Sequence, residues 1–193
     1  MFKSIYIRLA FTNMKKNKRS YLPFLVTSII TIMLFFDMSI IMDNSGIKEM
    51  PGAGSMRSIL GFGTVIVAIF ACVFLFYTNS FLIKQRRKEI GLYNVLGMGK
   101  KEIAIMMFWE SLMVGGASIL AGILGGIILG RLMFLLLYKI IGYQTSLQYE
   151  VTGSSISTTL ILFAVIFFVA FVSNLIQVRK ANPIELLRGG KCR

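Results

Sequence analysis

The chain has no histidine and only two cysteines, Cys72 and Cys192, among its 193 residues. A Ser-His-Asp triad, a two-histidine metalloprotease helix and His-led metal sites therefore cannot be built within it. Two cysteines cannot complete a structural zinc site, and their separation gives no disulfide pattern, so both are expected to be free thiols. The sequence predicts no metal site and no catalytic residues of its own.

Acidic residues are also scarce, with eight Asp and Glu against 21 Lys and Arg, for a formal net charge of +13. Apolar residues make up 56% of the chain and the mean hydropathy is +0.76, whereas soluble domains are roughly 45–50% apolar. Such a composition excludes a single soluble core and requires the basic residues to lie outside the hydrocarbon. It indicates a polytopic membrane protein whose basic surface meets anionic lipid headgroups rather than nucleic acid.

Four segments are long and apolar enough to span a membrane, because about 20 apolar residues at about 1.5 Å each cross the hydrocarbon. The predicted spans are residues 21–42, residues 58–83, residues 100–141 with an extension at the outer surface, and residues 156–178. The predicted fold is therefore all-α, with four transmembrane helices.

The basic residues indicate how these spans are oriented. Of the 21 Lys and Arg, 17 lie in residues 1–20, 84–101 and 179–193, whereas the connections 43–57 and 142–155 hold only Lys48 and Arg57. By the positive-inside rule, both termini and the middle loop are cytoplasmic, and the two connections are short external loops.

The basic N-terminal segment, residues 1–20, is predicted to form a helix in the cytoplasmic interface. Phe2, Ile5, Tyr6 and Leu9 fall at helical spacing, with basic residues elsewhere on the helix. A disordered basic tail is the alternative. The following apolar run is too long for a typical signal peptide and lacks an A-x-A-like cleavage site, which predicts an uncleaved first span.

A short cytoplasmic helix is expected within residues 84–99, between the second and third spans. Ile90, Tyr93 and Leu96 recur at helical spacing, and Gly97 and Gly99 supply a turn before the third span begins. Residues 94–101 do not match a P-loop, so no nucleotide is expected to bind there. The pattern fits an amphipathic helix packed on its own bundle or on lipid at least as well as one that docks a protein.

Several motifs add a resemblance that spacing alone does not give. They are Arg87–Met98, Lys100–Ile103 and Trp109–Ser111, followed near the C-terminus by Arg179–Arg188. Together they resemble the FtsX/MacB-type permeases of ABC transporters, with an FtsX-like domain over residues 58–188. Tyr77–Phe81 and Asn17–Pro23 are similar to the BceB-like permeases of peptide-antibiotic resistance modules.

The resemblance implies that the short cytoplasmic helix docks in a groove of a separate ATPase subunit, present in two copies, which binds ATP and Mg²⁺. Leu92 and Leu96 would supply apolar contact, with polar contact at the edges. The implied coupling residues are Glu89, Ile90, Gly91, Leu92, Tyr93, Leu96, Gly97, Met98, Lys100 and Lys101.

The resemblance covers one four-span unit of a BceB-like permease, which would continue into further spans and a large extracellular domain. The chain is therefore expected to be a natural half-size subunit or a truncated copy. A half-size subunit would pair with itself or with a longer permease in the bacterial cell membrane.

Small residues recur every four positions along the third span, at Ser118, Gly122, Gly126 and Gly130. Such a ridge lets two helices approach closely. The spacing does not distinguish packing within the four-helix bundle from a contact between subunits.

Two acidic residues fall inside the predicted spans. Asp37 is expected near the outer interface, with a functional intramembrane acid as the alternative. Glu110 lies just inside the cytoplasmic edge and is interpreted as a brace, paired with a basic or polar group on another span; a proton relay is the weaker alternative.

The sequence therefore predicts a non-catalytic permease subunit that couples ATP hydrolysis on another chain to movement of its spans. The resemblance suggests export or dislodging of a peptide or lipid-linked substrate. The alternatives are a non-transporting signalling partner of a sensor kinase or longer permease, and a small pore-forming or scaffold protein.

Overall fold

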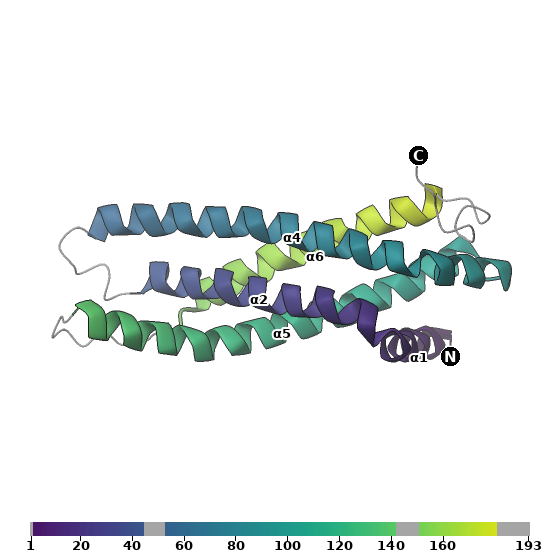
Figure 1. Ribbon diagram of the computed structural model, residues 1–193, viewed down its shortest axis with the longest axis horizontal. Helices are drawn as coiled ribbons and strands as arrows, with labels where there is room; N and C mark the ends of the chain where they lie inside the picture. The colour runs from purple at the N-terminus through teal and green to yellow at the C-terminus, as the bar shows by residue number, and fades with distance from the viewer. Residues whose placement is uncertain (1, 45–52, 142–150, 181–193) are drawn as a thin grey trace. The chain divides into compact units, whose positions relative to one another are not determined.

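The computed structural model describes residues 2–44, 53–141 and 151–180, and within these ranges every regular element is an α-helix. The helices are α1 (Phe2–Lys16), α2 (Lys18–Asp43), α4 (Ala53–Val95), α5 (Lys100–Ile141) and α6 (Gly153–Lys180), drawn in Figure 1. The predicted all-α fold is confirmed.

Four of these helices, α2, α4, α5 and α6, are long and apolar enough to cross a membrane. They contain the four predicted spans: α5 has the predicted bounds, and α2, α4 and α6 extend beyond theirs at both ends. Parts of the two external connections and of the C-terminal tail, residues 45–52, 142–150 and 181–193, lie outside the described residues.

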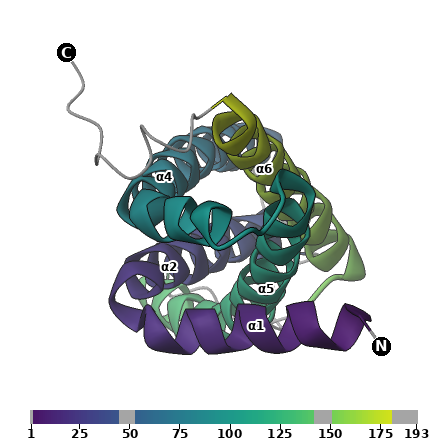
Figure 2. The same cartoon turned by 90° about the vertical axis from the view of Figure 1, so that its right-hand side faces the viewer.

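The N-terminal segment is helical, but it forms a helix distinct from the first span. α1 ends at Lys16, and α2 begins at Lys18 after the single residue Asn17. Figures 1 and 2 show α1 lying crosswise to the start of α2. The chain thus changes direction at Asn17, whose backbone oxygen accepts hydrogen bonds from the N–H groups of Ser20 and Tyr21.

The expected short helix within residues 84–99 is not a separate element, because α4 continues unbroken from Ala53 to Val95. Residues 84–90 contain no proline or glycine, and Lys, Arg, Gln and Glu all favour a helix. Nothing in the sequence therefore interrupts the helix where the apolar span gives way to charge. The predicted coupling segment is the last part of α4 and the turn that follows it.

The turn between α4 and α5 follows from its glycines. Gly97 has a φ of 92°, a left-handed conformation that glycine adopts without strain. The Met98 N–H donates to the Tyr93 oxygen at 3.0 Å and the Gly97 N–H to the Asn94 oxygen at 3.2 Å, the two bonds of a Schellman motif. At the start of α5, the Glu102 carboxylate accepts a hydrogen bond from the Gly99 N–H, as in a capping box.

The chain divides into two compact units, and α2, α4, α5 and α6 contribute to both. One unit, called here the ion-pair unit, comprises Met1–Thr27, Leu75–Gly116 and Val165–Arg193. The other, called the glycine unit, comprises Ser28–Phe74 and Ala117–Ala164.

An apolar cluster in the ion-pair unit holds the end of α4 against α5 and α6. Its buried members are Ile83, Ile90, Ile103, Met107 and Val178, and Tyr93, Met98 and Phe171 pack around them. The turn is therefore anchored to the helices on both sides of it by side chains that are shielded from solvent.

The small-residue ridge of α5 packs against α2 of the same chain in the glycine unit. A Cβ added at Gly122 would lie 2.6 and 2.7 Å from two carbons of Ile32, and one added at Gly126 would lie 2.6 Å from the Phe36 ring. Both partners are fully buried. The two central glycines of the ridge thus serve helix packing within the chain.

We predict that Gly122→Ala lowers the melting temperature of the protein in detergent. The new methyl group meets the Cβ of Ile32, which no rotamer change can move aside, and such overpacking costs about 1–3 kcal/mol. Gly116→Ala is the matched control on α5, because a Cβ there meets nothing within 4 Å. The control should be neutral or stabilising, since alanine favours a helix by about 1 kcal/mol over glycine. Equal effects of the two substitutions would contradict the packing argument.

Candidate functional site

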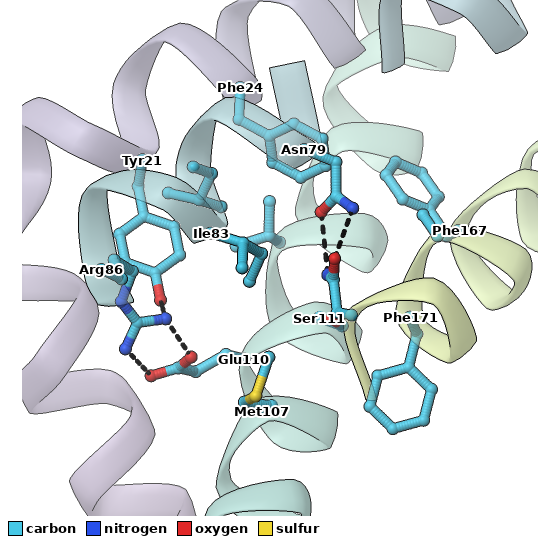
Figure 3. Close-up of a pocket in the computed structure, with 14 residues that line it drawn as sticks. Tyr21, Phe24, Asn79, Ile83, Arg86, Met107, Glu110, Ser111, Phe167 and Phe171 are labelled. Atoms are coloured by element: carbon cyan, nitrogen blue, oxygen red, sulfur yellow. Dashed lines mark hydrogen bonds and ion pairs between the residues drawn. The ribbon is translucent and has the colours of Figure 1, made fainter. Parts of the chain in front are cut away.

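A buried ion pair joins α4 to α5 in the ion-pair unit. The Arg86 guanidinium donates to both carboxylate oxygens of Glu110, at 2.5 and 3.0 Å, and the two side chains are 2% and 3% exposed. Arg86 also donates to the Tyr21 hydroxyl and lies 5.0 Å from the centre of the Tyr21 ring. Figure 3 shows the three side chains converging from α2, α4 and α5. The planar guanidinium suits such a two-point contact, which fixes orientation as well as position.

The sequence places Arg86 on the buried side of α4 by helical spacing. Ile83 and Ile90, three residues before and four after Arg86, are both in the apolar cluster. The basic neighbours Lys84 and Arg87 lie on other faces, and Lys84 is exposed. One residue of a basic run is thus buried because the helix face, and not the local charge, decides its position.

Two asparagines of the N-terminal segment extend the network from this ion pair to the end of α4. The Asn13 amide donates to Glu110 at 2.8 Å, and the Asn17 amide donates to Glu89 at 2.7 Å. Asn17 also donates to the Asn13 side-chain oxygen at 3.3 Å. Hydrogen bonds to a carboxylate are stronger than those between neutral groups, so α1 is held at Glu110 through Asn13 and the α1–α2 junction is held at Glu89 through Asn17.

The hydroxyl of Tyr93 adds a further contact, donating to the Asn13 side-chain oxygen at 3.4 Å. Burial raises the pKa of Tyr93 above its ordinary value, and the neighbouring Glu89 carboxylate raises it further. Tyr93 therefore remains a neutral hydrogen-bond donor throughout the physiological pH range.

A second polar contact joins α4 to α6. The side-chain amides of Asn79 and Asn174 donate to each other at 2.8 and 3.0 Å, and both are buried. A cavity of about 30 Å³ lies between this pair and the ion pair, bordered by apolar rings that include Phe24 and Phe167 (Figure 3). The polar side chains of both contacts line this cavity together with the apolar rings.

The predicted coupling residues divide between the surface and the interior of the ion-pair unit. Leu92 and Leu96 are 52% and 71% exposed, and Gly97, Lys100 and Lys101 are also exposed, whereas Ile90 is 1% exposed and Gly91 is buried. Glu89, Tyr93 and Met98 are partly buried against α1 or the apolar cluster. The exposed apolar side chains of this segment are those of Leu92, Val95 and Leu96, called here the docking patch.

The remaining predicted residues lie apart from the coupling segment in sequence, but Glu110 is connected to it through Asn13 and Asn17. Glu110 pairs with a basic group, as expected of a brace. Asp37 is buried in the glycine unit beside Gly126; one of its oxygens and the Ser118 hydroxyl have no hydrogen-bond partner among the described residues. Among those residues, no group of three or more His, Cys, Asp or Glu side chains is placed to hold a metal ion.

Sequence reasoning did not single out six residues of these polar contacts. They are Asn13, Asn17, Tyr21, Arg86, Asn79 and Asn174. A signal existed for two of them, because Asn79 and Arg86 fall at helical spacing with the buried Leu75, Leu82, Ile83 and Ile90. Asn17 and Tyr21 lie within the motif Asn17–Pro23, which did not indicate their contacts, and Asn13 and Asn174 are brought to their partners by packing alone.

Comparison with known proteins identifies the class to which this structure belongs. The model of the FtsX-like permease C-terminal family matches residues 61–183, and the chain belongs to this family. The matched region begins within α4, includes the turn and the ion pair, and ends beyond α6.

Curated relatives agree with this assignment. The chain is 24% identical over 181 residues to the bacitracin export permease protein BceB of Bacillus subtilis and 25% identical over 185 residues to BceB of Halalkalibacterium halodurans. It is 25% identical over 188 residues to the ABC transporter permease protein YxdM of Bacillus subtilis. These alignments cover 92–95% of this chain and 28–29% of each relative. The chain thus spans under a third of the length of these relatives.

We predict that Arg86→Met and Glu110→Leu each lower the melting temperature strongly, whereas the double variant loses less than the sum of the two. Each single change leaves an unpaired buried charge, which costs about 3–5 kcal/mol, and the double change removes both charges. Thermal unfolding of the three variants in detergent measures this coupling. Lys84→Met, an exposed position on the same helix, is the control and should behave like the wild type. Additive losses would show that the two residues do not act as a pair.

Proposed function

We propose that this membrane protein is the permease subunit of an ABC transporter and couples ATP hydrolysis on a separate ATPase to movement of its spans. The observation that carries the proposal is the construction of the α4–α5 turn. It exposes the apolar docking patch, while the residues directly behind the patch are fixed to the buried ion pair and the apolar cluster.

The position of the docking patch supports a protein partner. The apolar span of α4 extends over Gly54–Arg87, so Leu92, Val95 and Leu96 lie beyond its end. Large apolar side chains that face water in a cluster are typical of a docking surface. Such a patch fits an apolar groove, and the exposed Lys101 at its edge favours acidic groups on the rim of that groove.

The rigid backing of the patch supports the transfer of force. A partner that moves the end of α4 displaces Ile90 and Arg86, and these residues contact α5 through Ile103 and Glu110. Packed interiors resist compression, so a displacement at the turn reaches α5 without being absorbed locally.

The family supports the remaining parts of the proposal. The relatives are ABC transporter permeases, and two of them are bacitracin export permeases. We infer that the substrate is a peptide or lipid-linked molecule at the membrane, with a role in antimicrobial-peptide resistance, and that ATP and Mg²⁺ bind to the ATPase, present in two copies. A second permease chain, identical or longer, completes the assembly in the bacterial cell membrane, with both termini in the cytoplasm.

We predict that Leu96→Asp abolishes co-purification of the partner ATPase with the tagged permease from detergent. A carboxylate at this exposed position cannot enter an apolar groove without losing its hydration, but it does not disturb the buried cluster behind it. The measurement is the ratio of ATPase to permease after affinity purification of the tagged permease co-expressed with an ABC ATPase subunit from the same organism.

Leu96→Met is the matched control, because it keeps an apolar side chain of similar volume and should retain the ATPase. The size-exclusion profile of each variant reports whether the permease remains folded. If the wild-type chain retains no ATPase, or if Leu96→Asp retains it at the wild-type ratio, the proposed docking surface is wrong.

A further inference from the structure

The junction of α1 and α2 is tied to the docking end of α4 by side-chain hydrogen bonds. Asn17, the single residue between the two helices, donates to Glu89, and Asn13, one turn earlier, accepts from Tyr93. Glu89 and Tyr93 lie on either side of Leu92 in sequence. The residues behind the docking patch therefore contact α1 as well as α5.

The same two asparagines link α1 to the buried ion pair. Asn13 donates to the carboxylate oxygen of Glu110 that also accepts from Arg86. Because Asn17 donates to Asn13 as well as to Glu89, a continuous chain of hydrogen bonds runs from α4 through α1 to α5. Such connected networks hold their members in one arrangement.

Within Arg8 to Lys16, the part of α1 whose side chains the structure describes, few side chains are buried. Of these side chains, only Ala10 and Asn13 are buried, whereas Phe11, Thr12, Lys15 and Lys16 are exposed. Figure 2 shows α1 crossing beside α2 and α5 in the ion-pair unit. Within this described part of α1, Asn13 is the buried polar side chain that contacts other helices.

We propose that Asn13 and Asn17 are positioning residues, which make α1 and the start of α2 move together with the docking end of α4. This inference rests on the proposed function, because the partner ATPase supplies the movement. Force applied at the docking patch then has two routes: through Arg86 and Glu110 to α5, and through Glu89 and Asn17 to the α1–α2 junction.

The two routes can be followed separately in the full chain. Trp109 is the sole tryptophan and precedes Glu110, so incorporated fluorotryptophan gives one fluorine NMR signal that reports on α5. A trifluoromethyl label on Thr12→Cys, with Cys72 and Cys192 replaced by alanine, reports on the exposed side of α1. The labelled permease and unlabelled ATPase are placed together in lipid nanodiscs, with or without a non-hydrolysable ATP analogue.

In the otherwise unmodified labelled chain, we expect the ATP analogue to shift both signals. Asn17→Ala and Glu89→Ala remove the same hydrogen bond from its two ends, so each should reduce the shift at residue 12, while the contacts of Asn13 with Tyr93 and Glu110 remain. Asn17→Ala should retain the ATPase and the shift at Trp109, since Asn17 lies outside the coupling segment and Arg86 and Glu110 are unchanged. Glu89→Ala also removes the 3.5 Å contact between Glu89 and Arg86, so this variant is compared only at residue 12. Glu89→Gln keeps an oxygen that accepts from Asn17 and should restore the shift at residue 12.

Gln85→Ala is the matched control, because it removes an exposed amide from the same helix one turn before Glu89. It should leave both shifts intact.

Failure of the unmodified permease to bind the ATPase would overturn the proposed function itself. If the ATPase binds but residue 12 gives no shift, or keeps its full shift in Asn17→Ala and Glu89→Ala, the positioning role is wrong and the docking function stands. Loss of ATPase binding in Asn17→Ala would also overturn the positioning role.

Discussion

The bidentate contact between Arg86 and Glu110 is the interaction on which the ion-pair unit depends. Neither charge is stable alone in a buried, weakly polar environment, so each requires the other at a fixed distance and orientation. This requirement sets the position of α4 relative to α5 within the unit. Tyr21 accepts a hydrogen bond from Arg86, and Asn13 donates one to Glu110. These bonds also hold α2 and α1 against the ion pair.

The end of α4 combines a rigid interior with an exposed surface over very few residues. Ile90 is buried and Leu92 is exposed, although they are only two positions apart, because neighbouring residues on a helix point in different directions. The Schellman turn at Gly97 then reverses the chain without loosening its contacts. Such a surface suits the transmission of movement, since a partner that binds the exposed residues is connected through α4 to the apolar cluster behind them.

Much of the fold could be predicted from the sequence, because apolar length and the glycines of the turn act locally. The four long helices and the end of α4 before Gly97 follow from such signals. The sequence predicts a separate short helix within residues 84–99, whereas α4 continues to Val95, because residues 84–90 contain no proline or glycine between the apolar span and the charged segment. The partners of Glu110 and of the ridge glycines could not be derived, because they lie on helices far away in the chain.

The sequence by itself determined that the chain is a helical membrane protein, because long apolar runs must satisfy their backbone hydrogen bonds internally in lipid. It also determined where the basic residues concentrate. Only the tertiary structure decided which of those residues is structural. Lys84, Arg86 and Arg87 carry the same charge within four positions, but Arg86 alone of these three meets a buried carboxylate, because the packing of α4 against α5 directs that one helix face inward.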